Sequence, residues 1–123
     1  MTLGEIIAAL KQEPQDKILS IGFGRPHSYR GRYHDLAFEV RFRVSVAEVL
    51  DACQGAIGRE FDGWKGGVFL MDEDSECWLA ERGSSVDSAA ISPLLLAYML
   101  CKPITELRAI AVRDLGAEPE GTV

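Results

Sequence analysis

The chain of 123 residues lacks the long apolar segments that mark membrane and secreted proteins. Its longest apolar run covers residues 93–101, nine residues in all, whereas a membrane-spanning helix needs about 20. The first ten residues have no basic side chain before their apolar part and include Glu5, which is unlike a secretory signal. We therefore expect no membrane association.

Cysteine and histidine are also scarce. The three cysteines are an odd number and form no CxxC pair, so neither a disulfide framework nor a four-cysteine zinc site is expected. Each lies in an apolar stretch, which predicts buried, reduced thiols in a cytoplasmic protein; they are Cys53, Cys77 and Cys101. The two histidines, seven residues apart, form no HxxxH or HExxH motif, so we expect neither a metal site nor a cofactor.

What the chain does contain is typical of one soluble globular domain, with 47% apolar and 26% charged residues. The net charge of −6 is unevenly spread, because residues 17–44 carry six basic and only two acidic side chains. An acidic protein disfavours a nucleic-acid polymer as partner, whereas a local arginine cluster suits a small anion. Surface arginines paired with neighbouring acids are the alternative explanation.

Hydrophobic spacing predicts an α+β fold. A capping box at Thr2 and Glu5 starts a helix over 3–12, and a second one at Ser45 and Glu48 starts a helix over 46–58, closed by Gly58. Residues 17–23 are expected to form a strand, whereas residues 24–34 show no regular pattern and are expected to form a loop between two strands. The clearest strand signal covers 36–44, where five apolar residues alternate with polar ones and predict one buried face: Leu36, Phe38, Val40, Phe42 and Val44.

The second half of the chain gives weaker signals. Residues 68–71 and 77–80 are predicted to pair as a hairpin across an acidic turn, DEDSE, which lacks the glycine and glutamate of a calcium loop. Ser92 and Pro93 start an apolar helix over 93–101 that should be buried in the core or against another subunit. Residues 104–115 fit either a helix or a strand, and 117–123 a flexible tail. We expect a single small domain, 1–123, with a mostly antiparallel sheet packed by two to four helices.

The most unusual segment, residues 24–35, reads GRPHSYRGRYHD. Guanidinium groups present forked donors that match phosphate oxygens, and tyrosine and histidine rings offer faces on which a base can stack. The segment predicts a nucleotide or phosphate site. A long hairpin loop whose tyrosines cover the edge of the core is the alternative.

The second unusual segment is GWKGG, residues 63–67. Its glycines can place consecutive amides around an anion, while Lys65 adds a charge and Trp64 a stacking surface. A glycine-rich turn with a core tryptophan is the alternative. Neither segment matches a dinucleotide fingerprint or a P-loop.

Catalytic residues are hard to assemble. There is no GxSxG motif, and the cysteines lie among apolar residues, where a thiol is unreactive. We expect no catalytic residues. A small enzyme that acts on a nucleotide, or a protein-binding module that docks on a host factor, remain alternative functions.

Several of these segments, in this order, resemble the phage Thoeris anti-defence family of sponge proteins. The resemblance covers residues 17–83 and lies in HSYRGRYHDLAFE, REFDGWKGGVFLM and ECWLAERG. It implies a phage protein that acts in the cytoplasm of the infected bacterium and sequesters cyclic nucleotide immune signals without degrading them. The implied ligands are cyclic ADP-ribose isomers, with cyclic di- or trinucleotides at separate sites. The implied assembly is a homo-oligomer, a dimer or hexamer, with pockets at subunit boundaries.

We assign site residues by chemistry on this basis. We assign contacts with phosphate to Arg25, Arg30 and Arg32. We assign stacking on a base, or support of the loop, to Tyr29, Tyr33 and Trp64. We assign hydrogen bonds to His27 and Ser28, and a second contact with an anion to Lys65 and the amides of Gly66 and Gly67. The resemblance adds Trp78, Arg82 and Arg108.

Overall fold

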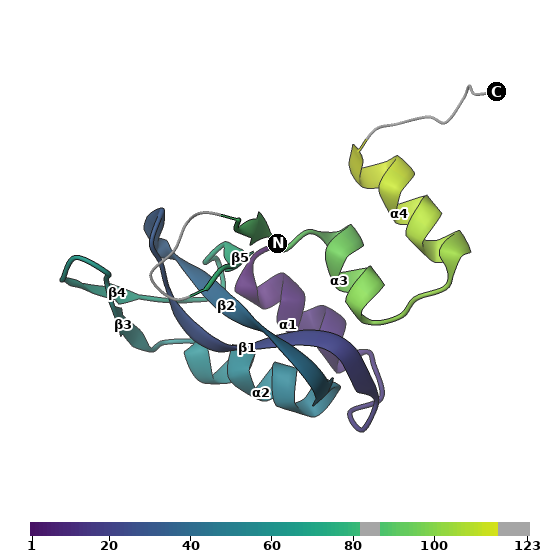
Figure 1. Ribbon diagram of the computed structural model, residues 1–123, viewed down its shortest axis with the longest axis horizontal. Coiled ribbons are helices and arrows are strands. Elements are labelled where there is room, and N and C mark those ends of the chain that lie inside the picture. Colours follow the sequence, from purple (N-terminus) through teal and green to yellow (C-terminus); the bar gives the residue numbers. More distant parts are fainter. Residues whose placement is uncertain (82–86, 116–123) are drawn as a thin grey trace. The chain divides into compact units, whose positions relative to one another are not determined.

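The computed structural model describes residues 1–81 and 87–115, and the chain divides into two compact units, Met1–Ile91 and Ser92–Val123 (Figure 1). The first unit contains α1 (Leu3–Lys11), β1 (Ile18–Tyr29), β2 (Arg32–Ser45), α2 (Val46–Ala56), β3 (Glu60–Asp62), β4 (Val68–Leu70), β5 (Cys77–Leu79) and β6 (Ala89–Ala90). The second contains α3 (Pro93–Met99) and α4 (Ile104–Leu115). The α+β class is confirmed, and the single domain over 1–123 stays a prediction.

Both helices of the first unit begin with the predicted capping boxes. The Glu5 amide donates to Thr2 Oγ1 at 3.2 Å, and the Thr2 amide donates to the Glu5 carboxylate at 2.8 Å. Ser45 and Glu48 make the same reciprocal pair of bonds. These bonds satisfy amides that have no partner within the helix, so they fix where each helix starts.

The central sheet has the strand order β1-β2-β5-β6 and is antiparallel except between β2 and β5. A parallel pair needs a crossover, which α2 and the β3–β4 hairpin supply. α1 and α2 lie side by side, and α2 packs against β1 (Figure 1). The largest fully buried side chains are Phe23, Phe38, Leu3, Ile6, Leu10, Leu19, Leu36, Met71, Ile91, Val46, Val49 and Cys53.

The segment without a sequence pattern, residues 24–34, is mostly strand. β1 and β2 together cover all of it except Arg30 and Gly31, which form the turn. The expectation of a loop is wrong because a register shift at Arg25, whose φ is 50°, interrupts the alternation that marks a strand. The arginines, tyrosines and histidines of this segment are therefore held on two paired strands.

β2 buries its apolar face over only part of its length. Leu36 and Phe38 are fully buried, as the alternation predicts, but Val40 is 37% exposed and Phe42 is 69% exposed. β5 pairs with β2 only from Leu36 to Phe38, so the rest of β2 has a strand neighbour on one side alone. The predicted buried face is confirmed at Leu36 and Phe38, is wrong at Val40 and Phe42, and is only partly buried at Val44.

The two predicted short strands exist as β4 and β5, but they do not pair with each other. β4 pairs with β3, which the sequence does not predict, and β5 pairs with β2 and β6. The acidic turn between them binds the start of α1, because the amides of Leu3 and Gly4 donate to the carbonyls of Ser75 and Glu73 at 2.8 and 2.9 Å. The turn therefore caps a helix.

The described part of the second unit, residues 92–115, contains two helices that contact each other. Ser92 accepts a hydrogen bond from the Leu95 amide at 3.1 Å, and Pro93 occupies the first turn, as predicted. α4 shows that residues 104–115 form a helix rather than a strand. The predicted tail, 117–123, lies outside the described residues.

Two of the three cysteines are buried. Cys53 and Cys77 lie in the interior of the first unit, whereas Cys101 is exposed, so the prediction of a buried thiol is wrong there. Cys101 follows the end of α3 and adopts a φ of 60°, outside the helix. Burial raises the pKa of Cys53, and it raises the pKa of Cys77 to about 12.

These two thiols are expected to make the protein less stable at alkaline pH. In the unfolded chain a thiol ionises near pH 9, whereas folded Cys77 stays protonated up to about pH 12, so its stabilising effect is present below pH 9 and is lost as the pH rises toward 12. The loss approaches about 1.4 kcal/mol per pH unit for each thiol. Urea unfolding at several alkaline pH values should give a shallower pH dependence for Cys77→Ala than for the wild type, and equal slopes would contradict this.

Candidate functional site

Two hairpins that are distant in the sequence meet in the first unit. The guanidinium carbon of Arg30, at the β1–β2 turn, lies 5.0 Å from the centre of the Trp64 ring in the β3–β4 turn. The Tyr33 ring stacks on Phe69 at 5.2 Å, and His34 meets Phe69 edge-on at 5.0 Å. We call these five residues the arginine–aromatic cluster. The structure thus brings together the two segments that the sequence singled out.

Cationic and aromatic groups of this region face solvent. Arg25, Arg30, Arg32 and Lys65 are exposed, and Trp64 is 54% exposed. The Arg25 Nη1 atom lies 3.7 Å from Glu39 Oε1, a pair at the surface that contributes little to stability. The surface therefore offers guanidinium and ammonium groups beside an indole face, which are the groups that bind phosphates and stack on bases.

Three of the predicted site residues are buried instead, and their polar atoms are engaged within the hairpin or its surroundings. The Ser28 hydroxyl donates to the Tyr33 carbonyl at 2.6 Å, and His27 Nδ1 lies 3.2 Å from the Arg25 carbonyl. Tyr29 is the third. These side chains hold the hairpin that presents the exposed arginines.

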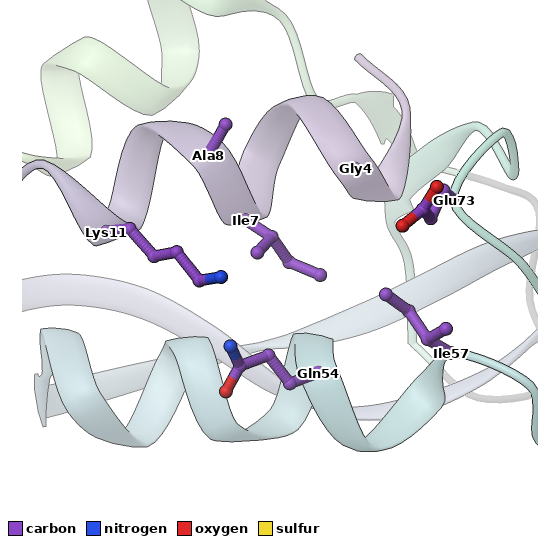
Figure 2. A pocket seen from close by; sticks show the side chains of 7 residues that line it. All are labelled: Gly4, Ile7, Ala8, Lys11, Gln54, Ile57 and Glu73. Atoms are coloured by element: carbon purple, nitrogen blue, oxygen red, sulfur yellow. The ribbon is translucent and has the colours of Figure 1, made fainter.

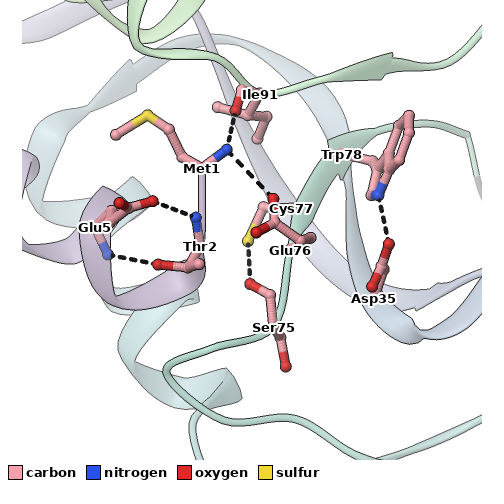
Figure 3. A network of polar contacts seen from close by, with 9 residues as sticks. All are labelled: Met1, Thr2, Glu5, Asp35, Ser75, Glu76, Cys77, Trp78 and Ile91. Carbon is pink, nitrogen blue, oxygen red and sulfur yellow. Dashed lines mark hydrogen bonds and ion pairs between the residues drawn. The ribbon is translucent and has the colours of Figure 1, made fainter.

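Tyr29 and Trp78 form a stacked pair below the hairpin tip. Their ring centres are 4.5 Å apart and their planes differ by 10°. The Trp78 Nε1–H donates to Asp35 at 2.9 Å (Figure 3), and the Tyr29 hydroxyl lies 2.7 Å from the Ser88 hydroxyl. Trp78 is partly exposed and Tyr29 is not. The stack connects the end of β1 to β5 and so holds the strand end next to the β1–β2 turn.

The glycine-rich turn uses its amides to close itself. The Gly66 amide donates to the Gly63 carbonyl at 3.1 Å, and the Gly63 amide donates to the Gly67 carbonyl at 2.9 Å. Gly66 and Gly67 have φ values of 102° and 84°, which only glycine adopts readily. The Gly66 amide is thus engaged within the turn, while the Lys65 side chain extends into solvent.

Sequence reasoning missed Phe69, His34 and Asp35. Phe69 joins the cluster because β4 pairs with β3, and that pairing places Phe69 on the face opposite Val68. Asp35 reaches Trp78 because β2 and β5 are parallel neighbours. Val68 and Leu70 are more exposed than Phe69, and this alternation could have predicted the position of Phe69 once the pairing of β4 with β3 was known.

Two further candidates, Arg82 and Arg108, come from the resemblance. Arg82 is outside the described residues, and Arg108 is exposed on α4 in the second unit. Within residues 1–81 and 87–115, no group of three or more His, Cys, Asp or Glu side chains could hold a metal ion. No helix in the same ranges combines the length and the apolar character that crossing a membrane requires.

Gly63 allows the glycine-rich turn to pack against Phe69. A Cβ atom at Gly63 would lie 2.6 Å from Phe69 Cε2 and 2.7 Å from the Gly66 carbonyl oxygen. We expect Gly63→Ala to lower the free energy of unfolding by about 1–3 kcal/mol. Gly55→Ala is the matched control, because a Cβ there meets nothing within 4 Å and α2 should gain up to about 1 kcal/mol. Denaturant unfolding of both variants measures this, and equal stabilities would contradict it.

We compared the chain with protein family models, with curated proteins and with solved structures, and none of the three comparisons gave a match.

Proposed function

We propose that the first unit binds a small cyclic nucleotide, such as an isomer of cyclic ADP-ribose, and sequesters it without catalysis. The observation that carries this proposal is the placement of Arg30 over the exposed Trp64 ring. It puts a guanidinium group and an aromatic face from two hairpins within reach of one compact ligand.

The chemistry of the cluster supports a phosphorylated ligand. Each charge-assisted hydrogen bond from an arginine to a phosphate contributes about 1.5–3 kcal/mol, and a base stacked on an aromatic ring contributes about 1–3 kcal/mol. The net charge of −6 disfavours long polyanions, whereas the local arginines favour a compact one. Binding of this kind needs neither a nucleophile nor a metal ion.

The resemblance to the Thoeris anti-defence family supplies the ligand class and the biological role. On that basis the protein would act in the cytoplasm of an infected bacterium, where it would remove a cyclic immune signal by holding it. The arginine–aromatic cluster lies in two of the three segments that carry the resemblance.

The test is a thermal-shift screen against cyclic ADP-ribose isomers and cyclic di- and trinucleotides, followed by release of the bound ligand on heating. We expect one ligand class to raise the melting temperature and to be recovered intact. Recovery of a cleaved nucleotide would show an enzyme. No shift with any nucleotide, together with a stoichiometric protein partner from lysate, would show a protein-binding module.

We also propose that the first unit associates with a second copy of the chain through two surfaces, one on the β3–β4 hairpin and one on β2. Val68 and Leu70 are 58% and 56% exposed and share one face of the β3–β4 hairpin with Glu60 and Asp62, their cross-strand partners. Apolar side chains gathered in this way usually mark an interaction surface.

A complementary surface lies on the open part of β2. Phe42 and Val40 are exposed there, whereas Arg41 between them points to the opposite face of the strand. A second copy of the chain would thus offer Phe42 and Val40 as apolar partners for Val68 and Leu70 of the first.

Phe42→Asp is expected to weaken this association without unfolding the protein, because the side chain is 69% exposed. Light scattering should give the wild type a mass above 13.5 kDa that rises with concentration, and should give the variant the monomer mass. Ile104→Asp, which alters an exposed apolar residue of α4, is the control and should behave like the wild type. A wild type that stays at 13.5 kDa would contradict the proposal.

A further inference from the structure

A second candidate site lies between α1 and α2, apart from the arginine–aromatic cluster. It is a pocket of about 310 Å³, which we call the α1–α2 pocket (Figure 2). Its lining residues are Gly4, Ile7, Ala8, Lys11, Gln54, Ile57 and Glu73. Small-molecule sites commonly occupy about 300–1,000 Å³, so the pocket suits a small ligand.

The pocket has opposite charges at its two ends. Figure 2 shows the Lys11 amine with the Gln54 amide group toward one end and the Glu73 carboxylate at the other. Glu73 is held beside the first turn of α1, because its carbonyl accepts from the Gly4 amide at 2.9 Å. The backbone of Lys11 lies seven residues after Gly4, about 10 Å along the helix axis, and its side chain reaches back along the pocket toward Ile7 (Figure 2).

The polar side chains at both ends are available to a ligand. Among the described residues, the side chains of Lys11, Gln54 and Glu73 make no hydrogen bond or ion pair. Between them the wall is apolar, because Ile7 and Ile57 form it; their side chains are 8% and 38% exposed.

This arrangement selects a zwitterion that is longer than one amino acid. The amine and carboxylate of a single amino acid are attached to one carbon and lie close together, whereas a peptide advances about 3.3–3.6 Å per residue, which separates the two charges of a di- or tripeptide. An aliphatic side chain in its middle would lie on Ile7 and Ile57.

We propose that the α1–α2 pocket binds a free di- or tripeptide with an aliphatic side chain, its carboxylate at Lys11 and Gln54 and its amine at Glu73. The proposal does not depend on the nucleotide site, because it uses other residues and another ligand chemistry.

The test titrates the isotopically labelled full chain with the tripeptide Gly-Leu-Gly and follows the NMR signals of Ile7 and Ile57. We expect saturable shifts with a dissociation constant of about 1 mM, a weak site. Acetylation of the peptide's amine, or amidation of its carboxylate, should each weaken binding about two- to fivefold, the range of an exposed ion pair.

Paired variants identify which end of the peptide each side chain binds. Glu73→Gln should weaken binding of the free peptide but not of the acetylated one, and Lys11→Gln should weaken binding of the free peptide but not of the amidated one. Both side chains are exposed, so both variants should fold. Absent shifts at Ile7 and Ile57, or equal affinity for all three peptides in the wild type, would overturn the proposal.

Discussion

Arg30→Ala is expected to weaken binding of the cyclic nucleotide by about 1.5–3 kcal/mol, which is about 10- to 150-fold in the dissociation constant. The proposed function requires this, because the Arg30 guanidinium lies over Trp64 at the point where the two hairpins meet. The folded protein should be little affected, since Arg30 is exposed and surface substitutions usually change stability by about 0.5 kcal/mol or less. Isothermal titration calorimetry and thermal unfolding measure the two effects separately.

Two further variants sharpen this measurement. Arg30→Lys keeps the charge but loses the forked pair of donors, so its affinity should fall between those of the wild type and Arg30→Ala. Arg113→Ala removes an exposed arginine of α4, paired with Asp114 at 3.6 Å, and should bind like the wild type. If Arg30→Ala lowers the melting temperature strongly while its affinity is unchanged, Arg30 is a structural residue.

Phe38→Ala is expected to lower the free energy of unfolding by about 3–5 kcal/mol, the usual cost of emptying a buried aromatic site. Phe38 is fully buried, and its ring lies 4.9 Å from that of Phe23. A loss of this size is a large part of the total stability of a domain, which is about 5–15 kcal/mol. Urea unfolding monitored by circular dichroism measures it.

The same strand provides the matched control. Phe42 lies four residues further along β2 but is 69% exposed, so Phe42→Ala should change the stability by less than about 0.5 kcal/mol. Similar losses for the two variants would show that β2 is covered along its whole length, contrary to the structure. The comparison is best made at a low protein concentration, where a second copy is not bound.

Local signals predicted much of the fold. The capping boxes at Thr2 and Ser45 locate the starts of α1 and α2, because a capping box is complete within four residues. Ser92 and Pro93 locate the start of α3 for the same reason. Such signals need no knowledge of the rest of the chain.

Pairing between distant segments could not be predicted in this way. The alternation in β2 looks the same at Phe38 and at Phe42, but only Phe38 lies where β5 pairs with the strand. The acidic turn reads as a hairpin connection, whereas its Glu73 and Ser75 carbonyls accept hydrogen bonds from α1. In both cases the outcome depends on which partner reaches the segment, and composition does not encode that.

The candidate site shows the same division. Its chemistry was visible in the sequence, because arginines and rings are dense in residues 24–35 and GWKGG is unusual. Its geometry was not, because the contact of Tyr33 with Phe69 depends on the unpredicted strand β3. The burial of Tyr29 against Trp78 likewise depends on the order of strands in the sheet.

The two tryptophans occupy contrasting settings, and this gives the protein an intrinsic optical probe. Trp64 is 54% exposed under a guanidinium group, while Trp78 is stacked on Tyr29 and bonded to Asp35. Emission from Trp64 should lie at longer wavelength and be quenched by iodide, whereas emission from Trp78, which is only partly exposed, should be quenched less. A decrease of the longer-wavelength Trp64 emission on addition of a nucleotide would therefore show that the ligand binds at the arginine–aromatic cluster, without any label.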